Sequence, residues 1–204
     1  MKNLTFLDSV KQMPLFELPV RSTVVHLDQA VVLISSGSQL TKDQLKSAGA
    51  VTDIVAPNLL HTAGLAQAIE VFPQARVWKS LTAEAWPYQS ELSIVNLKGM
   101  PKFDETVFVH KASKTLIATD LCFNLVEAKG FGSWLILNMF GTYRKFAISK
   151  LFMKYITDRD TFKKSIKQVL AYDFNHLVVG HGQTIEENAK PLFEKALKDR
   201  NLYP

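Results

Sequence analysis

The feature that most constrains the fold of this chain is an almost wholly apolar run near its start. Residues 30–35 read Ala-Val-Val-Leu-Ile-Ser, and a β-branched run of this length is typical of a strand. A strand with one face in water alternates apolar and polar residues, but this run does not alternate. We therefore expect a sheet that is covered on both faces, and so a fold built of several layers.

Two predicted hairpins divide the rest of the chain into similar halves. The first joins residues 21–26 to 30–35, and the second joins 106–110 to 115–119 through a four-residue polar connection. Further strands are expected at 53–56, 75–78, 92–97 and 176–179, and helices or helical turns at 41–48, 64–72, 81–86, 159–171 and 186–199. Two such halves predict two sheets packed face to face with helices outside, an α/β (α+β) fold of four αββα layers.

The length and the spacing of these elements predict one domain over residues 1–204 with a helical insertion at about 124–171. Within the insertion, apolar residues recur at helical spacing and Gly141 is expected to break the run. They are Leu135, Met139, Tyr143, Phe146, Leu151 and Tyr155. We expect the helical stretch at about 131–155 to lie over the mouth of a site.

Cysteine usage and hydropathy bound the compartment. Cys122 is the only cysteine, which excludes an intramolecular disulfide and a cysteine-based zinc cage. The first residues carry polar Asp8, Ser9 and Lys11 where a signal peptide needs an apolar run, and no stretch approaches the roughly 20 apolar residues of a spanning helix. The expected location is the cytoplasm.

Positive charge is concentrated in residues 129–167, within a chain whose formal net charge is +5. Such a cluster could attract an anionic ligand or a membrane surface, but the pattern favours a solvated helix face, and a homodimer contact remains open. No nucleic acid is expected, because no aromatic-rich RNA motif or glycine-rich phosphate loop accompanies the cations. They are Lys129, Arg144, Lys145, Lys150, Lys154, Arg159, Lys163, Lys164 and Lys167.

Three polar residues stand just after predicted strands. His61 follows the strand at 53–56, Asp120 follows 115–119, and His181 follows 176–179. Loops at strand ends are where layered α/β folds hold ligands. Two imidazoles and a carboxylate suit one zinc ion, with iron and manganese as alternatives, and leave a position open for water.

The segments around these residues resemble the metallo-β-lactamase superfamily. Ile54-Val-Ala-Pro-Asn-Leu-Leu-His61-Thr-Ala-Gly64 resembles the signature HxHxDHxxG, with His61 as its last histidine. Thr115-Leu-Ile-Ala-Thr-Asp120 is similar to the strand that ends in the metal-bridging aspartate, and Gly180-His181-Gly182 to the last histidine turn. A closer likeness is to an uncharacterised bacterial and plant branch of the superfamily, a domain of unknown function. The resemblance implies a single metallo-β-lactamase-like domain.

The sequence departs from that pattern at specific ligands. Ala56 and Asn58 stand where the first two histidines belong, Leu60 where the aspartate belongs, and Gly99-Met100-Pro101 near a further expected histidine. Methyl and isobutyl groups offer no lone pair to a metal, so the binuclear site is incomplete. By the resemblance His61, Asp120 and His181 are the ligands of one of the two metals.

These residues lead to two hypotheses about function. In the first, the protein is a mononuclear metal-dependent hydrolase of an ester or phosphoester, with a small-molecule substrate that the sequence does not identify. Leu60 cannot accept the proton of the attacking water, so catalysis needs another base. In the second, the protein is a non-catalytic ligand-binding or scaffold protein that has lost the binuclear site.

Overall fold

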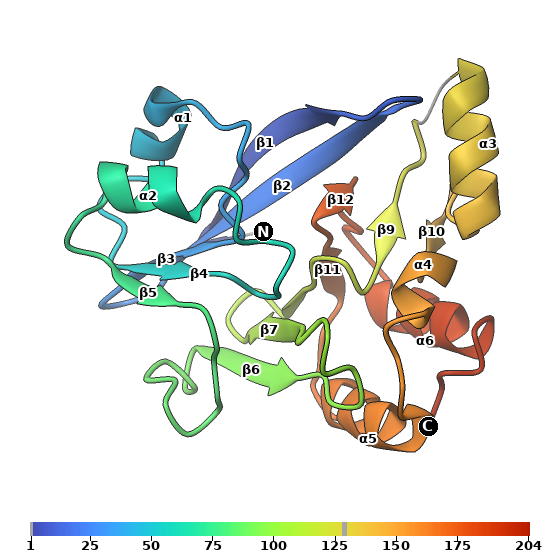
Figure 1. The fold of residues 1–204 in the computed structure, drawn as a ribbon. Coiled ribbons are helices and arrows are strands. Elements are labelled where there is room, and N and C mark those ends of the chain that lie inside the picture. Colours follow the sequence, from blue (N-terminus) through green and yellow to red (C-terminus); the bar gives the residue numbers. More distant parts are fainter. Residues whose placement is uncertain (1, 128–129) are drawn as a thin grey trace.

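The chain forms two main sheets and one small one, and the computed structural model describes residues 2–127 and 130–204 (Figure 1). The first sheet has the order β1 (Leu4–Gln12), β2 (Glu17–His26), β3 (Val31–Ile34), β4 (Asp53–Val55), β5 (Arg76–Trp78). The second has the order β11 (His176–Val178), β8 (Thr115–Ile117), β7 (Thr106–His110), β6 (Leu92–Asn96). The small sheet joins β10 (Phe146–Ala147), β9 (Phe123–Asn124) and β12 (His181–Gly182).

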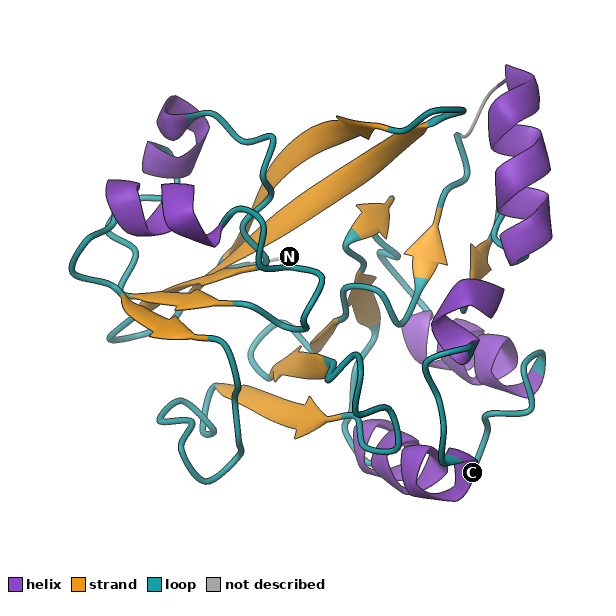
Figure 2. Ribbon diagram, viewed as in Figure 1, coloured by secondary structure: helices purple, strands orange, loops and turns teal. Residues whose placement is uncertain are grey.

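Helices lie on the outer side of each main sheet (Figures 1 and 2). The first sheet carries α1 (Lys42–Lys46) and α2 (Leu65–Val71), and the second carries α5 (Arg159–Leu170) and α6 (Ala189–Lys198). Between β9 and α5 the chain forms α3 (Gly130–Phe140) and α4 (Lys150–Met153), and Figure 1 shows α3 at the edge of the molecule.

Side-chain alternation along the strands separates three apolar cores. On the first sheet, Val24, Leu33 and Ile54 pack toward α1 and α2. Their neighbours Val25 and Ile34 point the other way, into a core shared with the second sheet. The outer face of the second sheet packs on α5 and α6. Alternate residues of the apolar run at 30–35 pack into two different cores, so this strand has no face exposed to water. The predicted four-layer αββα sandwich is confirmed.

Most predicted elements are present, and the differences are strands that the sequence did not predict. The strand β1 was not predicted, although it pairs with β2 over its whole length. The helical turn expected at 81–86 is present as a single turn, closed by the Trp86 N–H and the Thr82 carbonyl at 3.1 Å, and Pro87 follows it. The predicted break at Gly141 is present, since α3 ends before this residue, which has φ of 69°, but the strand β10 between α3 and α4 was not predicted.

A buried carboxylate ties the start of β4 to β5. Asp53 accepts from the indole of Trp78 at 2.8 Å, the hydroxyl of Tyr88 at 2.7 Å and that of Thr52 at 2.8 Å, and it pairs with Arg76 at 3.0 Å. Burial raises the pKa of Asp53, but these donors together outweigh it and lower the pKa below its ordinary value. The carboxylate is therefore a structural anion of the first sheet.

Two findings bear on the membrane and charge expectations. Among residues 2–127 and 130–204, no helix has both the length and the apolarity needed to cross a bilayer. Lys129, the first cation of the predicted basic stretch, lies outside the described residues.

Candidate metal centre

The structure brings His61, Asp120 and His181 together at the ends of strands. His61 is in the loop after β4, Asp120 follows β8, and His181 follows β11 and begins β12. One ligand atom from each of the three residues lies within 4.8 Å of the others. All three sequence-predicted ligands therefore meet, although they come from segments far apart in the chain.

Asp120 lies between the two imidazoles. Its Oδ2 is 2.9 Å from Nε2 of His61, and its Oδ1 is 3.1 Å from Nε2 of His181. The two rings are 5.7 Å apart between centroids, and the three side chains are only 7 to 12% exposed. Burial raises the pKa of the Asp120 carboxyl, but the neighbouring imidazoles outweigh that effect and hold the pKa well below its usual range.

The tautomer of His181 is determined by its other nitrogen. Nδ1 lies 2.8 Å from the carbonyl oxygen of Pro19, which can only accept, so Nδ1 carries a proton. Nε2 is then free either to offer its lone pair to a metal or to carry a second proton toward Asp120. Phe123 stacks on the ring at 4.9 Å and fixes its plane. Burial lowers the pKa of His181, but the bond and the charge of Asp120 outweigh it and raise the pKa.

His61 is oriented by Ser35, which the sequence indicated only as the last residue of the strand at 30–35. The Ser35 hydroxyl contacts Nδ1 of His61 directly after β3. The backbone of Ser35 is left-handed, with φ of 64°, which is uncommon for a residue other than glycine. The buried Ser22 hydroxyl donates to the Ser35 carbonyl and stabilises this turn. As a result, Nε2 of His61 faces Asp120, as Nε2 of His181 does.

Asn58, which stands where the signature has a histidine, makes hydrogen bonds that the sequence did not predict. Its side-chain oxygen accepts from the backbone N–H groups of Leu60 at 2.9 Å and His61 at 3.0 Å. Its amide nitrogen donates to Oδ2 of Asp120 at 2.8 Å. Asn58 therefore shapes the loop that carries one predicted ligand and contacts another.

Glu105 was not predicted, and it lies fully buried beneath Asp120. Its Oε1 accepts from the backbone N–H groups of Thr119, Asp120 and Leu121, each at 3.1 Å. Its Oε2 lies 3.3 Å from the amide nitrogen of Asn58. Burial, followed by the charge of Asp120, raises the pKa of Glu105 to about 8. The available signal was a carboxylate placed directly before the apolar strand β7.

The donor set fits a metal ion. It offers two neutral imidazole nitrogens and a carboxylate oxygen, the usual ligands of zinc, and the Pro19 carbonyl fixes one tautomer.

No protein-family model matches the sequence, and no curated protein matches it.

Solved structures do match the fold. A metallo-β-lactamase from Pontibacter korlensis is 16% identical, with a TM-score of 0.64 over 98% of this chain and 96% of that one. The metallo-β-lactamase FIM-1 from Pseudomonas aeruginosa, in its mono-zinc form, is 12% identical, with a TM-score of 0.61 over 100% of this chain and 94% of that one. The chain has the metallo-β-lactamase fold.

A third solved structure that matches this fold belongs to a longer protein. The rubredoxin oxygen:oxidoreductase of Desulfovibrio gigas is 13% identical, with a TM-score of 0.62, and the alignment covers 95% of this chain and 58% of that one. These identities show a shared fold and leave the chemistry to the residues of this chain.

The positions that depart from the metallo-β-lactamase signature cannot complete a second metal site. Ala56 is buried and carries only a methyl group, and Leu60 is exposed to solvent. Near the expected further histidine, Met100 is buried and the Gly99 carbonyl accepts from the backbone of Thr157 at 2.8 Å. This segment packs toward α5 and offers no imidazole.

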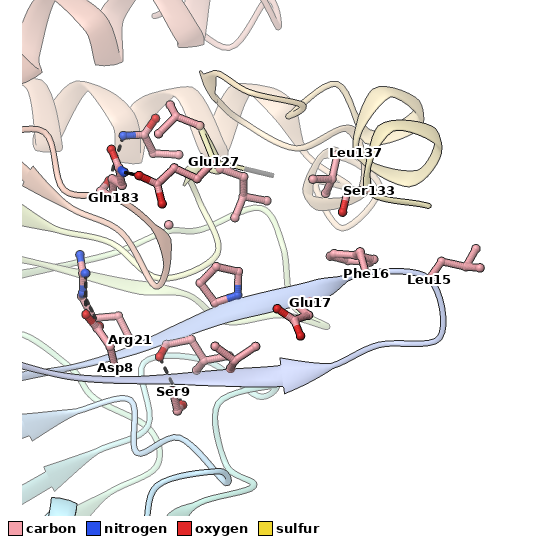
Figure 3. Close-up of a pocket in the computed structure, with 17 residues that line it drawn as sticks. Asp8, Ser9, Leu15, Phe16, Glu17, Arg21, Glu127, Ser133, Leu137 and Gln183 are labelled. Carbon is pink, nitrogen blue, oxygen red and sulfur yellow. Dashed lines mark hydrogen bonds and ion pairs between the residues drawn. The ribbon is translucent and has the colours of Figure 1, made fainter. Parts of the chain in front are cut away.

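A cavity of about 640 Å³ lies behind His181 in this metallo-β-lactamase fold (Figure 3). The β1–β2 hairpin, β9, β12 and the inner face of α3 line it, with Leu137 facing the hairpin. It borders the centre through Pro19, whose carbonyl receives Nδ1 of His181. Arg21 and Asp8 form an ion pair of 2.7 Å on its wall. The cavity is thus lined by neighbours of His181, Pro19 and Gly182, and not by His181 itself.

Proposed function

We propose that the protein is a mononuclear metal-dependent hydrolase of an ester or phosphoester. Nε2 of His61, Nε2 of His181 and one oxygen of Asp120 would hold the ion, and zinc is the metal that best suits this set. When bound, such an ion lowers the pKa of a coordinated water toward roughly 7 and polarises the attacked group. The observation that carries the proposal is the bond from His181 Nδ1 to Pro19, because it keeps Nε2 available for a metal.

The residues of this chain would bind and orient. Ser35 and Pro19 hold the two rings so that both Nε2 atoms face Asp120. Glu105 binds the N–H groups at and around Asp120 and so fixes the loop after β8. A single-metal centre agrees with the mono-zinc form in which one similar structure is described. Since Leu60 has no group that accepts a proton, another base would have to take the proton of the attacking water.

Elemental analysis of protein purified without a metal-binding tag tests this proposal. We expect close to one transition-metal ion per chain, lost on substitution His61→Ala or His181→Ala. The matched control is His26→Ala, since His26 contacts Thr5 at 3.2 Å, outside the centre. Hydrolysis of a panel of carboxylic and phosphoric esters should require the ion. The proposal would be overturned if the purified protein contains no metal and its stability changes neither with added zinc nor with chelator.

A non-catalytic binding or scaffold role is the second candidate, and one observation favours it. Both oxygens of Asp120 already receive hydrogen-bond donors, from His181 on one side and from His61 and Asn58 on the other. A protonated His181 would satisfy this cluster without an ion. One bound metal without hydrolysis of any ester, or no metal with an intact fold, would support this role.

We place the protein in the cytoplasm. Cys122 is buried and burial raises the pKa of its thiol, followed by the effect of the charge of Glu105, so it behaves as an inert core residue that needs no oxidising compartment. Fractionation of cells that express the tagged full chain tests this location.

A further inference from the structure

The helix α3 has apolar side chains on both its inner and its outer face. Residues 130–140 contain no charged residue. Its inner residues Ser133 and Leu137 are buried toward the hairpin, where Leu137 lines the cavity behind His181. A short helix with apolar side chains on both faces needs a partner for its outer face as well.

The outer face of α3 is exposed. Phe131 is 74% exposed, Trp134 48%, Leu135 45% and Met139 57%. Residues three, four and eight positions apart share one side of a helix, so these side chains form one stripe. Phe131 and Trp134 stack on one another at 5.6 Å, which keeps them together on the surface. Soluble proteins rarely expose a contiguous patch of this kind without a binding role.

The tip of the β1–β2 hairpin extends this stripe. Leu15 is exposed, and Gly132 lies so close to the Leu15 carbonyl that a Cβ at Gly132 would be 2.0 Å from its oxygen. Figure 3 shows Leu15 pointing outward from the tip beside α3. We call the five side chains Leu15, Phe131, Trp134, Leu135 and Met139 the apolar edge.

The chain that continues from α3 is cationic. Residues 130–157 contain four cations and no aspartate or glutamate. These cations are Arg144, Lys145, Lys150 and Lys154, all exposed. The helix α4, which begins at Lys150, packs against α3. Positive charge therefore lies next to the apolar edge.

We propose that the apolar edge and the adjoining cations dock the protein on an anionic lipid bilayer. An apolar stripe beside lysines and arginines is complementary to such a surface, because side chains such as Phe131 enter the acyl boundary while the cations stay at the headgroups. Trp134 joins an apolar body to a polar N–H, which suits the boundary between the two.

A second copy of the chain is a weaker occupant of the same surface. A two-fold dimer built on α3 sets the same patch against itself. It would bring the lysines that adjoin each stripe near one another, and residues 130–157 supply no carboxylate to pair with them. An anionic bilayer satisfies both the apolar stripe and the charge, and this docking is independent of the metal centre.

Cosedimentation of the full-length protein with vesicles tests the docking. We expect binding to mixed phosphatidylcholine–phosphatidylserine vesicles, weakening as salt rises, and little binding to phosphatidylcholine alone. Binding should shift the emission of Trp134 to shorter wavelength, and Trp134→Phe should remove that shift. Phe131→Ser with Met139→Ser should abolish binding, while Leu192→Ser with Ile69→Ser, at exposed apolar sites on α6 and α2, should leave it unchanged.

Charge variants complete the test. Lys145→Gln, Lys150→Gln and Lys154→Gln together should weaken binding to anionic vesicles, by roughly five-fold for each charge removed. The matched triple Lys79→Gln, Lys98→Gln and Lys102→Gln, at exposed lysines outside residues 130–157, should have little effect. Equal binding to neutral vesicles, no binding to either kind, or self-association that the Phe131 and Met139 substitutions abolish would each overturn the proposal.

Discussion

The substitution Asp120→Asn separates the hydrogen-bonding role of the centre from its metal-binding role. Asp120 accepts three donors, Nε2 of His61 at 2.9 Å, Nε2 of His181 at 3.1 Å and the amide of Asn58 at 2.8 Å. Asparagine has the same shape but only one acceptor oxygen, so its own amide must face one of these N–H groups. The change removes the buried charge that pairs with the imidazoles, and the new amide N–H can pair with His181 only if Nε2 of that ring gives up its second proton.

The expected cost follows from these contacts. Breaking a buried ion pair by neutralising one partner costs about 3 to 5 kcal/mol, and we expect Asp120→Asn to lower the unfolding free energy in chelator by about that amount. For a chain of this length that corresponds to a fall of roughly 10 °C in Tm. Urea unfolding should show a lower midpoint with an unchanged slope.

The second half of this prediction concerns the stabilisation that added zinc provides. Metal at about 100 times its Kd stabilises a binding protein by about 2.7 kcal/mol, so wild type should gain about that much while the variant gains little. Asp173→Asn is the control, because that aspartate is exposed and paired with Lys114, and it should behave as wild type. A loss below about 1 kcal/mol in chelator would refute the hydrogen-bond reasoning. If the difference in unfolding free energy between wild type and Asp120→Asn stays the same after zinc addition, Asp120 is not a ligand.

Three other substitutions test the surroundings of the centre and of the first sheet. Ser35→Ala removes the hydroxyl at Nδ1 of His61 and should weaken zinc binding roughly ten-fold or more, measured by competition with a chelating dye. Asn58→His with Leu60→Asp should raise the metal stoichiometry in elemental analysis if the loop keeps the family geometry, and an unchanged stoichiometry in a folded variant would contradict that geometry. The folded-state pKa of Asp53 is lowered, so its stabilisation is present above the unfolded value of about 3.8 and is lost as pH falls through the folded pKa. Asp53→Asn should therefore flatten the acid limb of the stability profile and lower stability at neutral pH.

The layers of the fold were predictable because strand periodicity records which faces are covered. The apolar run at 30–35 indicated cover on both sides, and the structure places its alternate residues in two different cores. The strand β1 was missed because only Leu7 in it is buried and because its second half contains polar Asp8, Ser9, Lys11 and Gln12. The division of the 131–155 run depends on the left-handed Gly141, for which the sequence indicated a break but not a following strand.

The proximity of His61, Asp120 and His181 was predictable because strand ends in this kind of fold converge on one edge, and the resemblance assigned each of them a place. The partners that hold them were not predictable. Ser35 lies 26 residues before His61, and Glu105 lies 15 before Asp120. Their roles depend on side-chain directions across different strands, and a hydrogen bond between distant segments leaves no periodic trace in the sequence.

Asn58 offers a physical account of how the fold could lose a metal without collapsing. By the resemblance, Asp120 bridges two ions, so each of its oxygens would face a positive charge. Here Oδ2 instead receives the amide N–H of Asn58 at 2.8 Å, from the position where the signature has its second histidine. An amide nitrogen has no lone pair to offer a metal, but it donates a hydrogen bond that satisfies the same oxygen. The other end of Asn58 binds the N–H groups of Leu60 and His61, so the loop geometry no longer depends on a second ion. The single remaining ligand set can then bind one metal or stand as a hydrogen-bonded cluster, and the Asp120→Asn measurements in chelator and in zinc distinguish these two states.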